Sequence, residues 1–286
     1  MNYPAITVII PTLNAGVYIE KLLSVLLAQD VNVTEIIVID SSSDDRTVEI
    51  AKGFDVKTIV IPRHKFDHGK TRNLAAKEAK SGILVFMTQD ALPSDNTLVR
   101  KLTEPLKNPE IAATFGRHIP RGDASPTEFF ARHFNYPETG FVKGMEDIEK
   151  FGIKTFFSSN VCSAYKKDSF FQAGMFPEDI RANEDMLMTA KLILKGYKIA
   201  YVPEAKVIHS HNCSLLMQFE RYYNIGSSFK NYGWILHYTR PEKEGMRLIK
   251  EQLCFVIKQR KYLWIPYVFM ESLTKYLGFK IGLIKG

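Results

Sequence analysis

A run of five apolar residues that leads into an acidic loop constrains the fold of this chain most. Ile83 to Met87 (ILVFM) has strand length and no polar position, which is typical of a strand buried on both faces, as in a parallel sheet. Thr88, Gln89 and Asp90 follow directly. Ligands of open α/β sheets bind beyond the carboxyl ends of the strands, so Asp90 is a candidate ligand for a divalent cation that carries phosphates. An equally good interpretation is that Asp90 caps the next segment.

Strands and helices alternate through the first half of the chain. Apolar runs with strand character are separated by stretches whose apolar residues recur at helical spacing. The predicted strands cover residues 6–11, 35–40, 56–61, 83–87 and 111–116, and the predicted helices cover residues 17–29, 44–51 and 71–80. This order predicts an α/β fold with a doubly wound, mostly parallel sheet. The first strand–helix turn, PTLNAG, lacks the GxGxxG pattern of dinucleotide-binding folds, which argues against a dehydrogenase.

Length, charge and cysteine content narrow the class of protein. A chain of 286 residues, 45% hydrophobic and 24% charged, is long enough to bury a full core. It has no run of about 18 uncharged apolar residues, and its N-terminus leads directly into a strand, so we expect neither a transmembrane helix nor a secretory signal. Three widely spaced cysteines without a CxxC pair fit reduced thiols in a cytoplasm. The net charge of +7 favours an anionic partner, such as nucleotide phosphates, a membrane surface or nucleic acid.

Two predicted strands earlier in the chain also lead into polar residues. The first supplies Pro11, Thr12 and Asn14, and the second ends at Asp40, before a run of serines that leaves the backbone accessible to a ligand. Carboxylates at the ends of two strands, Asp40 and Asp90, suit the hydroxyl groups of a nucleotide and a metal-bound diphosphate. Taken alone, Asp40 is more readily explained as a turn residue whose side chain binds its own backbone.

A basic loop precedes the helix predicted at 71–80. Residues 63–73 (RHKFDHGKTRN) contain six Arg, Lys or His side chains, and Arg72 and Asn73 open the helix. Positive charge at a helix N-terminus is unfavourable unless an anion lies there. We therefore interpret Arg72 as a contact to a diphosphate or nucleotide, with Asn73 beside it. The alternative is a solvated charged loop.

Two elements late in the chain carry further candidates. Glu184 and Asp185 lie in the first turn of a predicted helix, where the helix dipole is expected to lower carboxylate pKa values and keep one of the two ionised. The alternative is that they only cap the helix. After the strand KIAYVP come His209 and His211, which would point to one face of a strand and could flank a metal ion.

The stretch from residue 117 to residue 165 is less regular and supplies candidates for an acceptor site. Arg117 precedes the aromatic-rich segment TEFFARHFNYPETGF. An aromatic and basic lining suits a carbohydrate, whereas the spacing of Phe130 and Phe134 is better explained by packing of an amphipathic helix. Ser159 and Asn160, in IKTFFSSNVCSAY, could also face an acceptor.

Five segments together resemble the family 2 inverting glycosyltransferases with a GT-A fold. They are TVIIPTLN, IIVIDSSSDDRT, GKTRNLAA, ILVFMTQDA and NEDM. The forms FDHGKTRN, FMTQDA, HFNYP and IKTFFSSNVCSAY look more narrowly like bacterial rhamnosyltransferases. The resemblance implies a GT-A catalytic domain over residues 1–225, with a nucleotide-sugar half to about residue 115 and an acceptor half over 116–225.

The resemblance also implies roles for single residues. Asp185 matches the catalytic base, with Glu184 beside it, and would take the proton of the acceptor hydroxyl as the nucleoside diphosphate leaves from the opposite face of the sugar. Asp90 would hold Mg²⁺ or Mn²⁺ on the diphosphate, with His209 preferred to His211 as a further ligand.

Many relatives carry DxD or DDD where this chain has Thr88-Gln89-Asp90, so its dependence on a metal is in question. The other predicted site residues are Pro11, Thr12, Asn14, Asp40, Arg72, Asn73 and Gln89 for the nucleotide sugar, and Arg117, Ser159 and Asn160 for the acceptor.

Residues 226–286 are predicted to form a basic, amphipathic helical tail. Between residues 241 and 286, nine Lys or Arg residues stand against four Glu and alternate with aromatic residues. Such helices bind anionic membrane surfaces in plane. The alternative is a helical pair that packs on the catalytic domain or on a second subunit of a homodimer. Pro266 is expected to break or kink this region.

We therefore predict a cytoplasmic enzyme, peripheral on the inner face of the cell membrane, that transfers a sugar with inversion. The predicted donor is dTDP-rhamnose, and the acceptor is a glycan or lipid-linked intermediate of a cell-surface polysaccharide. Two alternatives remain, a nucleotidyltransferase acting on sugar phosphates and a noncatalytic membrane-associated sugar-binding protein. The absence of a glycine-rich first loop argues against the former, and the intact Glu184–Asp185 pair argues against the latter. No nucleic-acid partner is expected, because the basic residues gather in the 63–73 loop and the tail.

Overall fold

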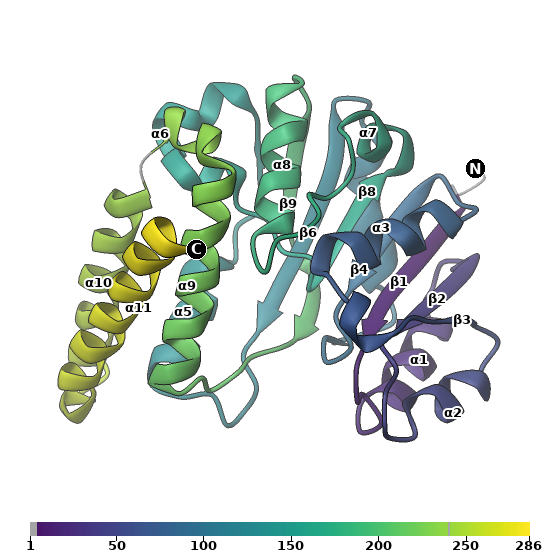
Figure 1. Cartoon of the computed structure of the whole chain (residues 1–286), viewed down its shortest axis with the longest axis horizontal. Helices are drawn as coiled ribbons and strands as arrows, with labels where there is room; N and C mark the ends of the chain where they lie inside the picture. The colour runs from purple at the N-terminus through teal and green to yellow at the C-terminus, as the bar shows by residue number, and fades with distance from the viewer. Residues whose placement is uncertain (1–4, 240) are drawn as a thin grey trace.

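One sheet of nine strands forms the centre of the computed structural model, which describes residues 5–239 and 241–286 (Figure 1). The strand order is β3-β2-β1-β4-β8-β6-β9-β5, and β7 pairs with β9 outside this path. The strands are β1 (Ile6–Thr12), β2 (Glu35–Asp40), β3 (Lys57–Val60), β4 (Ile83–Met87), β5 (Leu92–Pro93), β6 (Ile111–Ile119), β7 (Phe141–Lys143), β8 (Cys162–Lys166) and β9 (Lys198–Ile208). All residues of β4 are buried, as its uninterrupted apolar run predicts.

The sheet is mostly parallel, which confirms the fold class predicted from the sequence. β1 pairs in parallel with β2 and β4, β2 pairs in parallel with β3, and β6 pairs in parallel with β9. β8 lies between β4 and β6 and runs antiparallel to both, so β6 and β9 point the same way as β4. The short strands β5 and β7 run antiparallel to β9. The carboxyl ends of β1, β2, β4, β6 and β9 therefore lie along one edge of the sheet, where a ligand site is expected.

Helices cover both faces of the sheet and bury two apolar layers. The layer on one face includes residues of α1, α2 and α4, and the layer on the other includes residues of α3, α7 and α8. The α-helices are α1 (Ile19–Leu27), α2 (Thr47–Lys52), α3 (His68–Glu78), α4 (Leu98–Thr103), α5 (Pro126–Asn135), α6 (Ile148–Phe151), α7 (Lys167–Gln172), α8 (Glu184–Leu194), α9 (Leu215–Asn231), α10 (Pro241–Lys258) and α11 (Ile265–Lys285). Short 3-10 helices cover Arg63–Lys65, Glu104–Lys107, Met145–Asp147, Gly152–Phe156, Gly233–His237 and Tyr262–Trp264.

Helix α3 begins at His68, three residues before the predicted start, because Asp67 caps it. The Asp67 side chain accepts a hydrogen bond of 2.7 Å from the backbone N–H of Lys70. This carboxylate places negative charge at the N-terminus of a basic helix. The chain itself therefore provides part of the anionic partner that the basic helix start requires.

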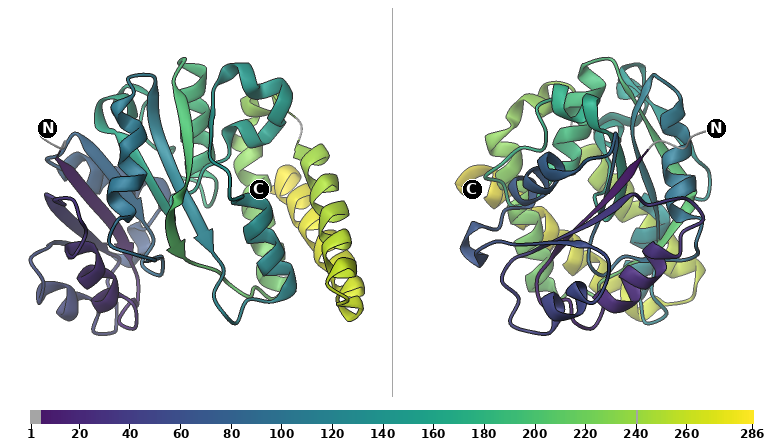
Figure 2. Two further views of the ribbon diagram at one scale, coloured as in Figure 1. Left: turned by 180° about the vertical axis from the view of Figure 1, so that it is seen from behind. Right: turned by 90° about the vertical axis from the view of Figure 1, so that its right-hand side faces the viewer.

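The C-terminal helices lie at the end of the molecule remote from β3, as Figures 1 and 2 show. α11 packs along α9, where Gly226, Gly278 and Gly282 let the two backbones approach closely. A Cβ atom on Gly282 would lie 2.0 Å from the carbonyl oxygen of Tyr223. The predicted boundary between catalytic domain and tail, at residues 225 and 226, falls inside α9. Pro266 lies in the first turn of α11, where its missing N–H is not needed, so it begins this helix instead of breaking it.

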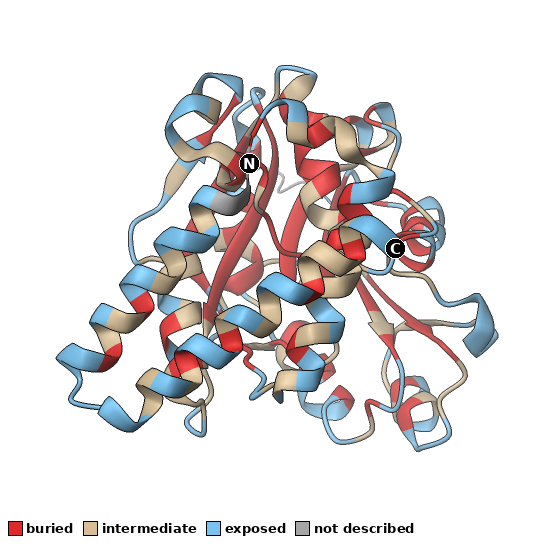
Figure 3. Cartoon of the chain, turned by 60° about the vertical axis from the view of Figure 1, so that its left-hand side comes forward, coloured by how far each residue is buried: buried red, intermediate tan, exposed pale blue. Residues whose placement is uncertain are grey.

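The outer sides of α10 and α11 form an exposed surface of the molecule (Figure 3). Among the described residues, no helix combines the length and the apolar character that crossing a membrane would need.

Candidate active site

A two-residue strand brings the loop after β4 to the end of β9. β8 and β6 separate β4 from β9 in the sheet, so residues that follow these two strands would otherwise lie roughly 14 Å apart at the usual strand spacing. β5 bridges this gap, because it pairs antiparallel with the last residues of β9. The turn between β4 and β5 thereby places Asp90 against His209 and His211, which follow β9.

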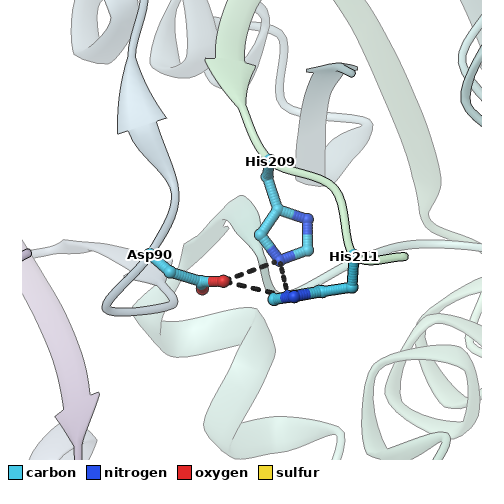
Figure 4. Close-up of side chains that lie close together, drawn as sticks. All are labelled: Asp90, His209 and His211. Carbon is cyan, nitrogen blue, oxygen red and sulfur yellow. Dashed lines mark hydrogen bonds and ion pairs between the residues drawn. The ribbon is translucent and has the colours of Figure 1, made fainter. Parts of the chain in front are cut away.

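Asp90, His209 and His211 form a compact group of oxygen and nitrogen donors (Figure 4). Asp90 Oδ2 lies 2.9 Å from His211 Nε2 and 3.5 Å from His209 Nε2, and the two Nε2 atoms lie 3.1 Å apart. A carboxylate and two imidazoles that converge in this way make a donor set suited to a divalent cation. His209 had been preferred to His211 from the sequence, but the structure brings both rings to Asp90.

The surroundings of this group favour the protonation states that metal binding requires. Burial opposes ionisation of Asp90, but the hydrogen bond from His211 and the neighbouring imidazoles outweigh it, so the pKa of Asp90 lies below its ordinary value. Burial lowers the pKa of His209 to about 3. His209 is therefore neutral at physiological pH and offers a nitrogen lone pair, while Asp90 is ionised.

Arg121 adds positive charge beside Asp90. Its Nη2 donates a hydrogen bond of 3.3 Å to the Asp90 carbonyl and lies 3.9 Å from Asp90 Oδ2. The guanidinium carbon also lies 5.6 Å from the centre of the Tyr18 ring. A guanidinium at this edge suits a phosphate group. Arg121 is not among the site residues predicted from the sequence, although its position a few residues beyond the strand predicted at 111–116 indicates a cation at the carboxyl edge of the sheet.

Hydrogen bonds tie together the loops after β1, β2 and β4. The Gln89 amide binds both backbone groups of Leu13, accepting from its N–H at 2.8 Å and donating to its carbonyl at 3.1 Å. Asn14, with a φ of 50°, accepts from the N–H of Asp44 at 2.9 Å and donates its own N–H to Ser43 Oγ at 2.8 Å. Gln89 and Asn14 therefore hold the loops after β1, β2 and β4 together, and their contact with a nucleotide sugar stays a prediction.

Asp40 is fully buried at the end of β2. Its carboxylate accepts hydrogen bonds from Thr12 Oγ1 at 2.8 Å, from the N–H of Ser43 at 2.8 Å and from Ser43 Oγ at 2.6 Å. These bonds are those of a turn residue that fixes its own loop, which is the alternative that the sequence left open for Asp40. Pro11 lies half-buried in β1 beside Thr12. Direct contact of Pro11, Thr12 and Asp40 with a nucleotide stays a prediction.

The predicted base lies at the start of α8, opposite the loop before β8. Asp185 Oδ2 accepts the backbone N–H of Asn160 at 3.2 Å, and Oδ1 accepts the N–H of Met186 at 2.7 Å. The Asn160 side chain is buried, donates to Glu184 Oε1 at 3.2 Å and accepts from Ser163 Oγ at 2.9 Å. Asn160, predicted to bind an acceptor, thus holds both carboxylates of the pair in place.

The two carboxylates differ in charge state. Burial opposes ionisation of Glu184, but the nearby Arg72 and the hydrogen bond from Asn160 hold its pKa below the ordinary value. Burial and then the charge of Glu184 raise the pKa of Asp185 to about 7. The expectation that the helix dipole lowers carboxylate pKa values at this helix start was therefore wrong for Asp185, because desolvation and a like charge outweigh the dipole. A carboxyl group that titrates near 7 is suited to take up a proton at neutral pH.

Arg72 is the partner of Glu184. It is only 4% exposed, its Nη1 lies 3.4 Å from Glu184 Oε1, and the same nitrogen donates a hydrogen bond of 2.8 Å to the His68 carbonyl. The side chain that was predicted to contact a diphosphate or nucleotide is instead directed at the carboxylate next to Asp185. The buried Glu184 carboxylate, which lies far away in the sequence, explains why a positively charged side chain is present at position 72.

Three other predicted contacts have protein partners in the structure. The Asn73 amide donates to the Phe176 carbonyl at 2.9 Å and accepts the Phe176 N–H at 3.1 Å, so both ends of the amide hold the segment before α8. Arg117 donates to Glu138 Oε1 at 3.0 Å. Ser159 is buried in the loop before β8, and its hydroxyl oxygen accepts a hydrogen bond of 3.4 Å from the backbone N–H of Val161.

Comparison with known proteins assigns the chain to a family. The family model described as Glycosyl transferase family 2 matches residues 7–172, which is more than half of the chain. The chain belongs to this family. It is a glycosyltransferase, as the resemblance noted in the sequence predicted.

Two relatives of this glycosyltransferase are similar over almost their whole length. The O-antigen chain rhamnosyltransferase RfbN of Salmonella typhimurium is 41% identical over 282 residues, which cover 97% of this chain and 89% of the relative. The O-antigen chain rhamnosyltransferase WbaN of Salmonella anatum is 38% identical over 282 residues, with 98% and 89% covered. The narrower resemblance to bacterial rhamnosyltransferases is thereby confirmed.

Solved structures support the GT-A-type fold of the glycosyltransferase. The mannosyltransferase PcManGT from Pyrobaculum calidifontis, in complex with GDP-Man and Mn²⁺, has a TM-score of 0.70 at 18% identity, covering 99% of this chain and 88% of the other. TarS 1-349 of S. aureus in complex with UDP-GlcNAc has a TM-score of 0.60 at 16% identity, with 98% and 90% covered. At these identities the likeness concerns the fold.

Proposed function

We propose that this glycosyltransferase transfers L-rhamnose from dTDP-rhamnose, with inversion, to a glycan or lipid-linked acceptor of a cell-surface polysaccharide. The choice of sugar and pathway rests on the similarity to RfbN and WbaN over nearly the whole chain. The reaction type rests on Asp185, a half-buried carboxyl group whose pKa is raised to about 7. This carboxyl group is the observation that carries the proposal.

Asp185 acts as the base. Its carboxylate takes the proton of the acceptor hydroxyl as that oxygen bonds to the anomeric carbon of the sugar. The bond between the anomeric carbon and the diphosphate breaks on the opposite face, and the nucleoside diphosphate leaves with the electron pair. The backbone N–H groups of Asn160 and Met186 orient the two carboxylate oxygens. Asp185 must be ionised for this step, so activity should rise as the pH passes about 7.

Asp90, His209 and His211 would hold a divalent cation. The two imidazoles favour Mn²⁺ over Mg²⁺, because Mg²⁺ prefers oxygen ligands throughout its coordination shell. When bound there, a cation would supply positive charge to offset the negative charge on the departing diphosphate. Thr88 and Gln89 supply no carboxylate, and the Gln89 amide is bound to Leu13, so the two histidines would complete the donor set beside Asp90.

Release of nucleoside diphosphate by the purified protein tests the proposal. The protein is incubated with dTDP-rhamnose, GDP-mannose or UDP-GlcNAc, each with Mn²⁺, with Mg²⁺ and with a chelator. We expect turnover of dTDP-rhamnose above the other donors and above the chelated sample. Asp185→Asn should abolish turnover but leave donor binding, measured by calorimetry, nearly unchanged. Asp168→Asn, which changes an exposed aspartate on α7, is the matched control.

Each outcome bears on a separate part of the proposal. Turnover by the Asp185→Asn variant would remove Asp185 as the base. Preference for another donor would refute the choice of rhamnose without affecting membership of the family. The anomeric configuration of the transferred sugar, read by NMR, must be opposite to that of the donor if the reaction inverts.

A further inference from the structure

We propose that the exposed face of α11, together with the turn before it, lies in plane on an anionic lipid surface. Binding of this face to lipid does not depend on the proposed function. Only the link to a lipid-linked acceptor rests on that function. The sequence indicated a basic tail, and the structure now selects one face of one helix.

The exposed face of α11 is apolar from Phe269 to Leu277 and again at Ile284, with Lys280 between these two parts. Its exposed large hydrophobic residues are between 44% and 72% accessible and are Phe269, Met270, Leu273, Tyr276, Leu277 and Ile284. At 3.6 residues per turn these positions project within an arc of about 120°. The opposite side of α11 carries buried residues such as Val268, Gly278 and Gly282, and the two glycines pack on α9. A helix surface in water normally carries polar residues where α11 carries apolar ones.

The turn between α10 and α11 combines positive charge with apolar side chains. Lys258, Arg260 and Lys261 are exposed and are followed by Tyr262 and by Leu263, which is 94% accessible. Anionic headgroups attract such basic residues, while aromatic and leucine side chains enter the boundary between headgroups and acyl chains. The turn therefore has the chemistry of an interfacial anchor.

Two of the four acidic residues of the tail, Glu271 and Glu244, do little to offset this charge. Glu271 is buried, lies 3.0 Å from Lys275 Nζ and accepts from Gln252 at 3.3 Å. Glu244 is paired with Lys154 and Arg247 at 3.0 and 2.8 Å. These carboxylates are directed at protein partners, whereas the basic turn faces outward.

The first turn of α9 connects α11 with the loop of the candidate metal site. Gln218, in the first turn of α9, donates a hydrogen bond of 3.2 Å to Glu271 near the start of α11. The cap of α9, Ser214, is three residues after His211 of the candidate metal site. A sugar acceptor attached to a lipid in that surface would therefore be presented near the reacting end of the enzyme.

A second copy of the chain is the rival occupant of the apolar face. It carries the same net charge of +7 and the same basic turn, so charge does not favour its approach. An anionic lipid surface complements both the charge and the apolar side chains. We therefore assign the face to lipid.

Vesicle flotation of the full chain tests this assignment. The wild type should float with vesicles of phosphatidylcholine and phosphatidylglycerol, and less with phosphatidylcholine alone. The combined changes Phe269→Ser, Leu273→Ser and Leu277→Ser should lower vesicle affinity more than about ten-fold, because three side chains lose their transfer from water. Val60→Ser, which changes a 53% exposed residue on β3, is the control and should bind like the wild type.

The basic turn is tested separately. The combined changes Lys258→Gln, Arg260→Gln and Lys261→Gln should weaken binding to the anionic vesicles by roughly five-fold for each charge and should leave binding to neutral vesicles unchanged. Equal loss on both kinds of vesicle would contradict the electrostatic part of the proposal.

Three results would overturn the lipid assignment. They are failure of the wild type to float, equal flotation of the triple serine variant, or a wild-type dimer in sedimentation that the serine changes convert to a monomer without any vesicle binding. Donor hydrolysis without vesicles, measured for each variant, separates this proposal from the proposed function. Variants that no longer float should still hydrolyse the donor. A wild type that floats but hydrolyses no donor would count against the transferase activity and not against the lipid assignment.

Discussion

Replacement of Asp185 by Asn should abolish transfer and also remove a pH-dependent loss of stability. Burial and the charge of Glu184 raise the pKa of Asp185 to about 7 in the folded chain. In the unfolded chain an aspartate titrates near ~3.9. The folded state therefore favours the protonated carboxyl group, and the stabilisation from this group is present at low pH and is lost as the pH rises from about 4 to about 7.

The size of the effect follows from proton linkage. Between pH 5 and pH 8, a carboxyl group with these two pKa values lowers the free energy of unfolding by about 2.5 kcal/mol. This is an upper value, because Asp185 is half-buried and water screens part of the interaction. For a chain of this length it corresponds to a change in Tm of about 5 °C.

Calorimetric melting of wild type and Asp185→Asn at pH 5 and pH 8 measures this difference. The amide cannot accept both backbone hydrogen bonds of Asp185, from Asn160 and Met186, which costs about 1 kcal/mol at either pH. The informative quantity is thus the Tm of the variant minus the Tm of the wild type, compared between the two pH values. This difference should be more favourable to the variant at pH 8 than at pH 5. Asp168→Asn should show the wild-type pH dependence. If wild type and Asp185→Asn respond to pH in the same way, Asp185 does not titrate near 7, and the reason for assigning it as the base fails.

Three further outcomes follow from buried contacts. Arg72→Met should lower the free energy of unfolding, measured in urea, by about 3–5 kcal/mol because it leaves the buried Glu184 carboxylate without its cation. The control Arg46→Met, in an exposed ion pair, should lower it by less than about 1 kcal/mol. Gly282→Ala should destabilise by about 2 kcal/mol or more in the same assay, because its Cβ would meet a backbone oxygen on α9, whereas Gly245→Ala, in open space on α10, should stabilise by about 0.5–1 kcal/mol. His211→Ala should weaken Mn²⁺ binding, measured by electron paramagnetic resonance. Loss of a residue that only supports a metal ligand weakens metal binding by roughly 10- to 100-fold, so loss of a ligand should weaken it at least as much. Unchanged affinity would exclude His211 as a ligand.

The sheet and its ligand edge were predictable because they depend on local patterns. Apolar runs of strand length mark β1, β2 and β4, and polar residues after them mark the carboxyl edge. β8 lies in and just after a stretch whose sequence is less regular, and its antiparallel insertion between β4 and β6 has no local signal. The pairing of β5 with β9 has none either, although it decides that His211 joins Asp90. A two-residue strand is too short to show any period in the sequence.

Charge partners across the chain were the least predictable part of the site. Arg72 stands in a basic loop whose neighbours suggest an anionic ligand, but its partner Glu184 lies more than one hundred positions later in the sequence. The raised pKa of Asp185 likewise depends on burial by distant segments and on Glu184, whereas the sequence shows only the helix start. For both residues the neighbouring sequence indicates one role or pKa, whereas a contact with a distant segment determines the observed one.

The Arg72–Glu184 pair also explains how two adjacent carboxylates can have different roles. Two buried carboxyl groups side by side cannot both ionise at low cost, so the environment selects one of them. Arg72, on α3, stabilises the charge on Glu184 at the start of α8. That fixed charge in turn raises the pKa of Asp185 to about 7, the range in which a carboxyl group exchanges a proton at neutral pH. The same ion pair ties α3 to α8, so a contact between these two helices also determines which of the two carboxyl groups titrates near 7.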